Sequence, residues 1–142
     1  MIEYNCRFGD PETQVVLPLL ESDLLSIMMA CTEGTLEKCD VRFSDKYAAC
    51  VIMASEGYPA KYEKGYEITV PQQLWDDVFS AGTALKDGKL VTNGGRVLGV
   101  CAVSDTLSEA LKDAYEKVSA ISFQNAYYRH DIGRKALQAE GK

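Results

Sequence analysis

Residues 90–103 read LVTNGGRVLGVCAV, and this stretch decides the expected fold. Both of its ends are apolar and rich in β-branched residues, which is typical of strands. Asn93, Gly94 and Gly95 lie between the two ends, and Asn-Gly between apolar runs is a strong signal for a hairpin. The stretch therefore predicts two antiparallel strands joined by a tight turn.

A helix is expected directly after these strands, over residues 106–121. Thr106 and Glu109 have the spacing of a capping box at its start. The apolar residues that follow share one face at helical spacing: Leu107, Ala110, Leu111, Ala114, Tyr115, Val118 and Ile121. Because such a stripe needs a partner surface, we expect this helix to pack against the strands.

The segments before this unit also have the character of strands. Residues 47–55 (YAACVIMAS) suit a buried strand, and a turn signal follows at residues 56–59. Shorter strands are expected at residues 66–70 and at residues 78–85, the latter ending in the turn Asp87-Gly88. Strands in succession followed by a helix predict an α+β fold with antiparallel strands.

The N-terminal part has a different pattern. Residues 2–8 are rich in β-formers and predict a strand. Asp10, Pro11 and Glu12 then have the order of a helix start, with Asp as the cap and Pro at the first helical position. The change in composition near residues 35–45 places a domain boundary there, which divides the chain into residues 1–40 and residues 41–142.

Two helices are expected between the N-terminal strand and this boundary. The first follows Glu12 and is disturbed by Pro18. The second begins near Ser22 or Asp23 and ends at Gly34, because glycine is a common helix terminator.

Composition excludes several classes of partner. The 142 residues carry a net charge of −6, which argues against nucleic acid and against an anionic membrane surface. No apolar run approaches the length of a membrane span, and no secretory signal is apparent. The five cysteines form no CxxC pair, so a disulfide framework or a zinc site is not expected and a cytoplasmic location is.

Three polar residues alternate along the expected first strand. Glu3, Asn5 and Arg7 would share one face, since side chains alternate sides along a strand. Carboxylate and amide oxygens suit Mg²⁺, and a guanidinium can bind a phosphate through two hydrogen bonds. The alternative is a solvated edge strand without a ligand. Free N–H groups at the helix start after Asp10 could also receive an anion.

Five motifs of this sequence resemble those of one enzyme family. They are residues 3–14 (EYNCRFGDPETQ), 53–59 (MASEGYP), 78–83 (VFSAGT), 91–98 (VTNGGRVL) and 128–133 (YRHDIG). In this order they are similar to the phosphoribosylamine–glycine ligases of the ATP-grasp superfamily. The resemblance implies the end of an ATP-grasp domain followed by a small β-rich C-terminal domain with a packed helix.

The resemblance also implies a chemistry and roles for particular residues. In the family, ATP phosphorylates glycine and the amine of 5-phosphoribosylamine attacks the resulting glycyl phosphate, which releases phosphate. It implies that Glu3 and Asn5 are ligands of Mg²⁺ or Mn²⁺ and that Arg7 stabilises the transferring phosphoryl group. Asp10 and Glu12 belong to the same motif and would meet the substrate, although Asp10 could instead only cap the helix.

Arg96 is the further substrate-binding candidate, directed at the ribose phosphate, whereas the glycines before it could only shape a turn. The glycine-rich loop and lysines that hold ATP in the family have no counterpart in these residues. We therefore expect the chain to need N-terminal domains and to be inactive alone. The alternative is a module without catalytic activity that binds a phosphate ligand or a partner.

Overall fold

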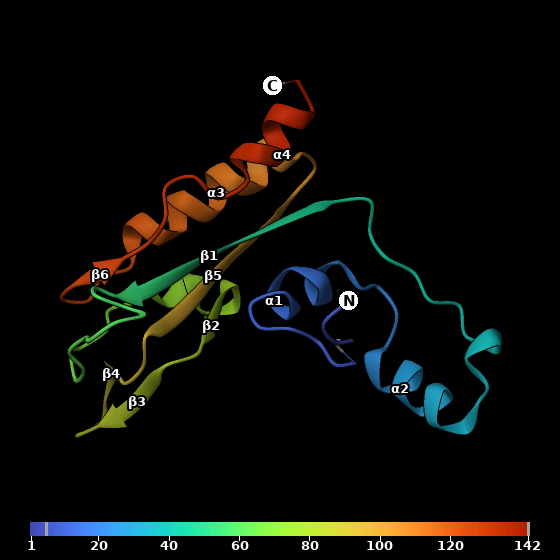
Figure 1. The fold of residues 1–142 in the computed structure, drawn as a ribbon, viewed down its shortest axis with the longest axis horizontal. Helices are drawn as coiled ribbons and strands as arrows, with labels where there is room; N and C mark the ends of the chain where they lie inside the picture. The colour runs from blue at the N-terminus through green and yellow to red at the C-terminus, as the bar shows by residue number, and fades with distance from the viewer. Residues whose placement is uncertain (5, 142) are drawn as a thin grey trace.

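The computed structural model describes residues 1–4 and 6–141. Its centre is an antiparallel sheet in the order β2-β5-β1-β6 (Figure 1). Its strands are β1 (Tyr47–Ser55), β2 (Val78–Ser80), β5 (Arg96–Ser104) and β6 (Ala126–Tyr127). A second sheet pairs β3 (Thr83–Lys86) with β4 (Lys89–Thr92). The predicted α+β class with antiparallel strands is confirmed.

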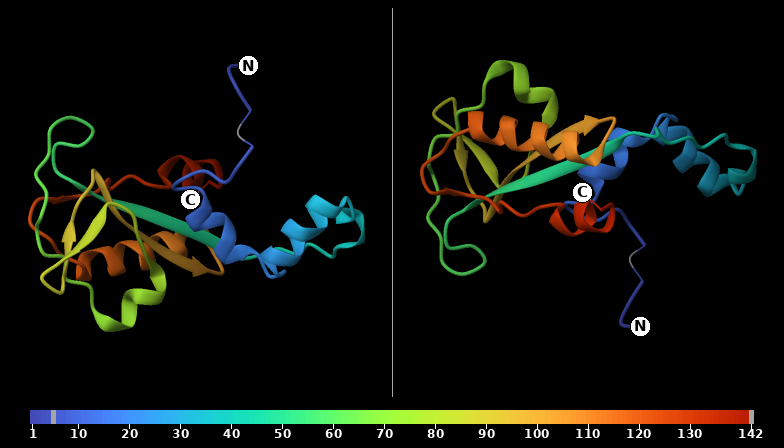
Figure 2. Two further views of the ribbon diagram at one scale, coloured as in Figure 1. Left: turned by 90° about the horizontal axis from the view of Figure 1, so that it is seen from below. Right: turned by 90° about the horizontal axis from the view of Figure 1, so that it is seen from above.

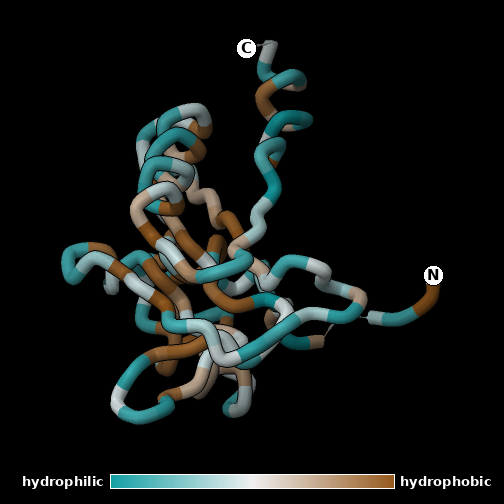
Figure 3. The backbone as a smooth tube through the Cα atoms, turned by 90° about the vertical axis from the view of Figure 1, so that its left-hand side faces the viewer, coloured by the Kyte–Doolittle hydropathy of each residue, from teal (hydrophilic) through white to brown (hydrophobic). Residues whose placement is uncertain are grey.

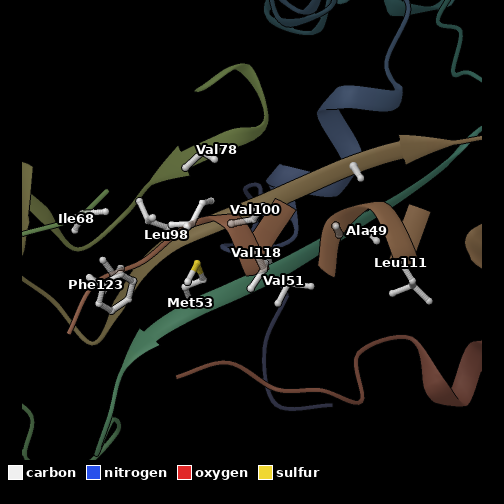
Figure 4. Close-up of a cluster of buried hydrophobic side chains, with 14 of the residues drawn as sticks. Ala49, Val51, Met53, Ile68, Val78, Leu98, Val100, Leu111, Val118 and Phe123 are labelled. Atoms are coloured by element: carbon white, nitrogen blue, oxygen red, sulfur yellow. The ribbon is translucent and has the colours of Figure 1, made fainter. Parts of the chain in front are cut away.

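Helix α3 (Leu107–Ala120) covers one face of the central sheet. Thr106 caps it as predicted, since its hydroxyl accepts from the Glu109 N–H at 3.2 Å and donates to the Glu109 carboxylate at 2.9 Å. Val118 of the helix packs with Val51 of β1 and Val100 of β5 (Figure 4). These three side chains are at most 1% exposed, so the predicted stripe forms the main core.

The opposite face of the sheet is covered by a much shorter element. In the register of β1 and β5, Cys50 lies opposite Cys101 and Ile52 lies opposite Gly99, on the side away from α3. Helix α1 (Thr13–Val16) contacts both strands. A Cβ on Gly99 would contact the Gln14 side chain at 3.9 Å, which places α1 over this position.

The hairpin predicted at Asn93-Gly94-Gly95 is wrong. Strand β4 pairs with β3, whereas β5 pairs with β1 and β2, so the two strands belong to different sheets. The hairpin turn is Asp87-Gly88, whose φ angles of 52° and 77° suit a type I′ turn. The single strand expected over residues 78–85 is divided between β2 and β3 at Gly82.

Close backbone packing explains where these strands divide. A Cβ on Gly82 would lie 2.5 Å from the Arg96 carbonyl oxygen and 2.5 Å from the Gly94 Cα. The Gly82 N–H donates to Arg96 and the Gly82 carbonyl accepts from Asn93, both at 2.7 Å. The two sheets therefore meet where glycine backbones touch, a contact between distant residues that periodicity does not reveal.

The N-terminal helices follow the predicted local signals. Pro18 lies in a 3₁₀ turn, η1 (Leu17–Leu19), directly after α1. Helix α2 (Leu24–Glu33) is capped by Asp23 and ends at Gly34, which has a φ of 67°. A second 3₁₀ turn, η2 (Leu36–Lys38), follows. Helix α2 stands away from the sheet in two directions of view (Figure 2).

The strand predicted over residues 2–8 is absent from the described part of that stretch. Residues 2–4 and 6–8 are not in a strand, and Ile2 and Tyr4 are 103% and 77% exposed. A strand is held by hydrogen bonds to a neighbour, and none pairs here. Figure 3 shows the N-terminal residues projecting from the rest of the molecule, whereas Leu137 of the C-terminal helix α4 (Arg134–Ala139) packs against the core.

Residues 66–70 form less strand than predicted. They make only isolated bridges, Glu67 with Val91 and Thr69 with Ser122. A 3₁₀ helix, η3 (Gln72–Asp77), follows them and was not predicted. Within residues 1–4 and 6–141, no helix combines the length and apolar character that a membrane span requires. The division into residues 1–40 and 41–142 stays a prediction.

Candidate functional site

The polar residues of the N-terminal segment are not brought together as the expected strand would bring them. Glu3 is exposed, and Asn5 lies outside the described residues. Arg7 is exposed, and its guanidinium donates to the Phe8 carbonyl oxygen at 3.0 Å. Residues 6–8 and Met28 of α2 line an open pocket of about 540 Å³.

The side chains of the N-terminal segment can be assessed as ligands for a divalent metal ion. No group of three or more His, Cys, Asp or Glu side chains within residues 1–4 and 6–141 could hold one. Mg²⁺, however, is normally held by one or two carboxylates together with water and phosphate oxygens. The carboxylate oxygens of Glu3 therefore fit the donor chemistry of such an ion.

Asp10 is not the helix cap that the sequence allowed. The cap position of α1 is Glu12, which makes no capping hydrogen bond through its side chain. The Asp10 carboxylate instead accepts from an Arg96 nitrogen at 2.9 Å, while a second Arg96 nitrogen donates to the Asp10 carbonyl oxygen at 2.9 Å. Asp10 and Arg96 are 86 positions apart, so this contact joins the N-terminal segment to β5.

Gln14 extends this contact toward the sheet. Its side-chain amide donates to the second oxygen of Asp10 at 2.9 Å. Its backbone carbonyl accepts from the Cys101 thiol at 3.2 Å. We name Asp10, Gln14 and Arg96 the Asp10 latch, because their hydrogen bonds hold α1 and the segment before it against the face of the sheet opposite α3.

Glu12, the other acidic candidate, lies on the same turn. Its carboxylate folds back over Gly9, where it occupies the space that a Cβ would take. The Thr13 hydroxyl and N–H both donate to the Gly9 carbonyl oxygen. The turn is therefore shaped by Gly9, and Glu12 stays exposed at its surface.

The end of β1 positions the turn before Arg96. The Ser55 hydroxyl donates to the Gly94 carbonyl oxygen at 2.9 Å, and the Ser55 N–H donates to the Gly95 carbonyl oxygen at 2.8 Å. The Tyr58 ring lies against Gly95, where it would overlap any Cβ. The two glycines thus let the turn pack closely, while Ser55 and Tyr58 are positioning residues that sequence reasoning did not single out for this role.

A cavity of about 170 Å³ opens beside Arg96. Its lining is aromatic and cationic: Ile52, Ala54, Tyr58, Arg96, Tyr127, Tyr128 and Arg129. Three tyrosines, Tyr58, Tyr127 and Tyr128, lie in this lining. Only Tyr128 packs against the core, and Tyr58 and Tyr127 are 44% and 55% exposed.

Arg129 brings a second guanidinium to this cavity. It donates two hydrogen bonds of 2.9 Å to Asp131, which hold the pKa of the Asp131 carboxyl below its ordinary value. Each guanidinium in the lining is thus oriented by a carboxylate, Arg96 by Asp10 and Arg129 by Asp131. Planar guanidinium groups with free edges bind phosphate or carboxylate well, so the cavity suits a small anionic group.

Comparison with known proteins identifies relatives of the whole chain. Residues 48–135 match the family described as "Phosphoribosylglycinamide synthetase, C domain". The phosphoribosylamine–glycine ligase of Synechocystis sp. is 52% identical over 96% of this chain and 34% of its own length. That of Caldanaerobacter subterraneus is 50% identical over 93% of this chain and 32% of its own.

Longer relatives contain the same region. The trifunctional purine biosynthetic protein adenosine-3 of Gallus gallus is 52% identical over 96% of this chain and 14% of its own length. The chain thus spans about a third or less of the length of these relatives.

A solved structure shares the fold. The crystal structure of phosphoribosylamine–glycine ligase from Thermotoga maritima superposes with a TM-score of 0.75 at 39% identity. The superposition covers 92% of this chain and 32% of that one. The sequence relatives and this fold agree, and the chain belongs to the phosphoribosylglycinamide synthetase family, of which it carries the C domain.

Proposed function

We propose that the chain is the C-terminal part of a phosphoribosylamine–glycine ligase. In that reaction the glycine carboxylate takes the terminal phosphoryl group of ATP, which gives glycyl phosphate and ADP. The amine of 5-phosphoribosylamine then attacks the acyl carbon, phosphate leaves, and the amine loses a proton. The observation that carries the proposal is the match to ligases at about 50% identity over nearly the whole chain.

Arg96 is the residue of this chain that we assign to the ribose phosphate. Its guanidinium borders the small cavity, and the Asp10 latch fixes its orientation. Orientation matters because an arginine that is already positioned loses less conformational entropy when it binds. Asp10 then acts mainly by holding Arg96, while Glu12 remains free to meet a substrate amine from its exposed turn.

The N-terminal segment would supply the phosphoryl-transfer residues. Glu3, together with Asn5 outside the described residues, would hold Mg²⁺ or Mn²⁺ with phosphate oxygens of ATP. The ion would neutralise phosphate charge, and Arg7 would add a guanidinium where charge develops during transfer. In this proposal residues 1–40 end an ATP-grasp domain, residues 41–142 form the C-terminal domain, and the chain alone is inactive.

The test is ADP formation that depends on both glycine and 5-phosphoribosylamine. We would compare the 142-residue chain with a version extended by the domains that precede the matching region in the ligases. Activity is expected only in the extended version and should be lost in its Glu3→Ala variant. Activity of the short chain would contradict the proposal.

Arg96→Ala in the extended version tests the phosphate assignment separately. Losing hydrogen bonds to a charged group should raise the KM for 5-phosphoribosylamine roughly tenfold to a hundredfold. Arg42→Ala is the matched control, because Arg42 is exposed, its guanidinium pairs with Asp40, and it does not line the cavity beside Arg96. An unchanged KM in Arg96→Ala would refute this role. Phosphate binding by an inactive extended protein would favour the non-catalytic module instead.

A further inference from the structure

Two cysteines lie directly opposite each other in the central sheet. Cys50 of β1 and Cys101 of β5 are register partners in neighbouring antiparallel strands, and both belong to the face away from α3. Opposed Cα atoms in such strands are about 4.5–5.5 Å apart. Disulfides span Cα separations of about 4.4–6.8 Å, so the backbone already has a suitable spacing.

The surroundings distinguish the two thiols. Cys101 is 4% exposed and donates to the Gln14 carbonyl oxygen, whereas Cys50 is only partly buried. The neighbouring Cys101 thiol lowers the pKa of Cys50, and the proximity of Cys50 together with burial raises the pKa of Cys101. Cys50 is therefore the thiol that ionises first and that an incoming reagent can reach.

From this geometry we propose that Cys50 and Cys101 form a reversible cross-strand disulfide site that reacts with small-molecule disulfides. The Cys50 thiolate attacks one sulfur of the reagent and releases one thiol, leaving a mixed disulfide. Cys101 then attacks the Cys50 sulfur, closes the protein disulfide and releases the second thiol. The two protons of the protein thiols pass to the two released thiols, so the reagent is reduced as the protein pair is oxidised.

Closing this bond would alter the Asp10 latch. The Cys101 thiol loses its proton and can no longer donate to Gln14, whose side chain holds Asp10. The contact between α1 and the sheet is then weaker, and Asp10 is the partner that orients Arg96. Oxidation of the two cysteines would thus change the orientation of Arg96 beside its cavity, because Gln14 connects Cys101 to Asp10.

The test uses the 142-residue chain with Cys6, Cys31 and Cys39 replaced by serine, so that only the opposed pair remains. The folded variant, checked by circular dichroism, is treated with oxidised glutathione. Intact mass should show the loss of two hydrogens without retained glutathione, and peptide mapping should join the segments of Cys50 and Cys101. The amides of α1 should exchange hydrogen faster, and dithiothreitol should restore the original rate.

The matched control adds Cys101→Ser to that variant. It leaves Cys50 without its partner, so one glutathione should stay attached. Persistence of both free thiols in the folded protein, or glutathione retained when both cysteines are present, would overturn the proposal. Closure only after denaturant is added would also overturn it, because the site would then not exist in the fold.

Discussion

The sheet region, residues 47–123, and the N-terminal region, residues 1–40, are held by different means. The sheet region buries its apolar side chains between the strands and α3, and Val51, Leu98 and Val100 are fully buried. In α2 of the N-terminal region only Ala30 is buried, and Leu25 is 65% exposed. The first region is stabilised by burial, the second mainly by local hydrogen bonds.

This difference divides the candidate site residues between a stable region and a loosely held one. The carboxylate and guanidinium candidates Glu3, Arg7 and Glu12 lie in the loosely held region, whereas Arg96 lies on a buried strand. The Asp10 latch is the contact that joins the two. Arg96 can therefore be oriented by this chain itself, whereas in the proposed ligase the N-terminal segment would take its shape against the preceding domains.

The largest contrast should come from the same substitution in each region. Leu98→Ala in the sheet should lower the free energy of unfolding by roughly 2–5 kcal/mol, because it leaves a cavity in the core. Leu25→Ala in α2 should change it by less than about 0.5 kcal/mol, since that side chain is largely exposed. Urea denaturation followed by tryptophan fluorescence measures both. Equal losses would show that α2 belongs to the same cooperative unit.

Helix caps give a smaller contrast. Thr106→Ala removes the cap of α3 and should lower the stability of the sheet region by about 1 kcal/mol. Asp23→Ala removes the cap of α2 and should reduce helix content without moving the unfolding midpoint of the sheet. Circular dichroism and fluorescence, recorded on the same denaturation series, separate the two effects. A shifted fluorescence midpoint in Asp23→Ala would contradict this division.

The Asp10 latch should couple the regions weakly. Asp10 and Arg96 side chains are 55% and 38% exposed, so solvent screens the pair. A double-mutant cycle with Asp10→Ala and Arg96→Ala should give a coupling energy of about 0.2–1 kcal/mol. A matched cycle on Lys112 and Glu116, an exposed pair within α3, provides the baseline. Coupling no larger than zero would mean that the latch does not orient Arg96.

Acidification should loosen α2 before it affects the sheet. Asp23 accepts hydrogen bonds from Ser26, with the larger effect from the hydroxyl and the smaller from the N–H. These bonds hold the pKa of the Asp23 carboxyl below its ordinary value of 3.8. Because the pKa of Asp23 is lower in the folded protein than in the unfolded chain, the ionised cap stabilises α2 at pH values above 3.8. This stabilisation is lost as the pH falls through the lower pKa of the folded state. Circular dichroism between pH 5 and pH 2 should show helix loss in the native chain and none in Asp23→Asn.

Local signals were sufficient for much of the fold. Strand β1 occupies the predicted residues 47–55, and the Thr106 cap, the Asp23 cap and the Gly34 stop are all formed by neighbours within a few positions. Each depends on backbone groups next to the residue that satisfies them. A single sequence contains that information directly.

Contacts between distant residues were not predictable in the same way. The pairing of β5 with β1 joins residues far apart in the chain, such as Val100 and Val51, and the role of Asp10 depends on Arg96. The strand expected at residues 2–8 had no neighbour to pair with in the described structure. For the site, the sequence pointed to Arg96 and Asp10, but not to Ser55 or Gln14 as the residues around them.

The most direct test of this account is hydrogen exchange of the amides in residues 1–8. It should be measured in the 142-residue chain and in the version extended by the preceding ligase domains. We expect rapid exchange in the short chain and marked protection in the extended protein, with β1 and β5 protected in both. Equal protection of residues 1–8 in the two proteins, whether high or low, would contradict the proposal that this segment takes its shape against the preceding ligase domains.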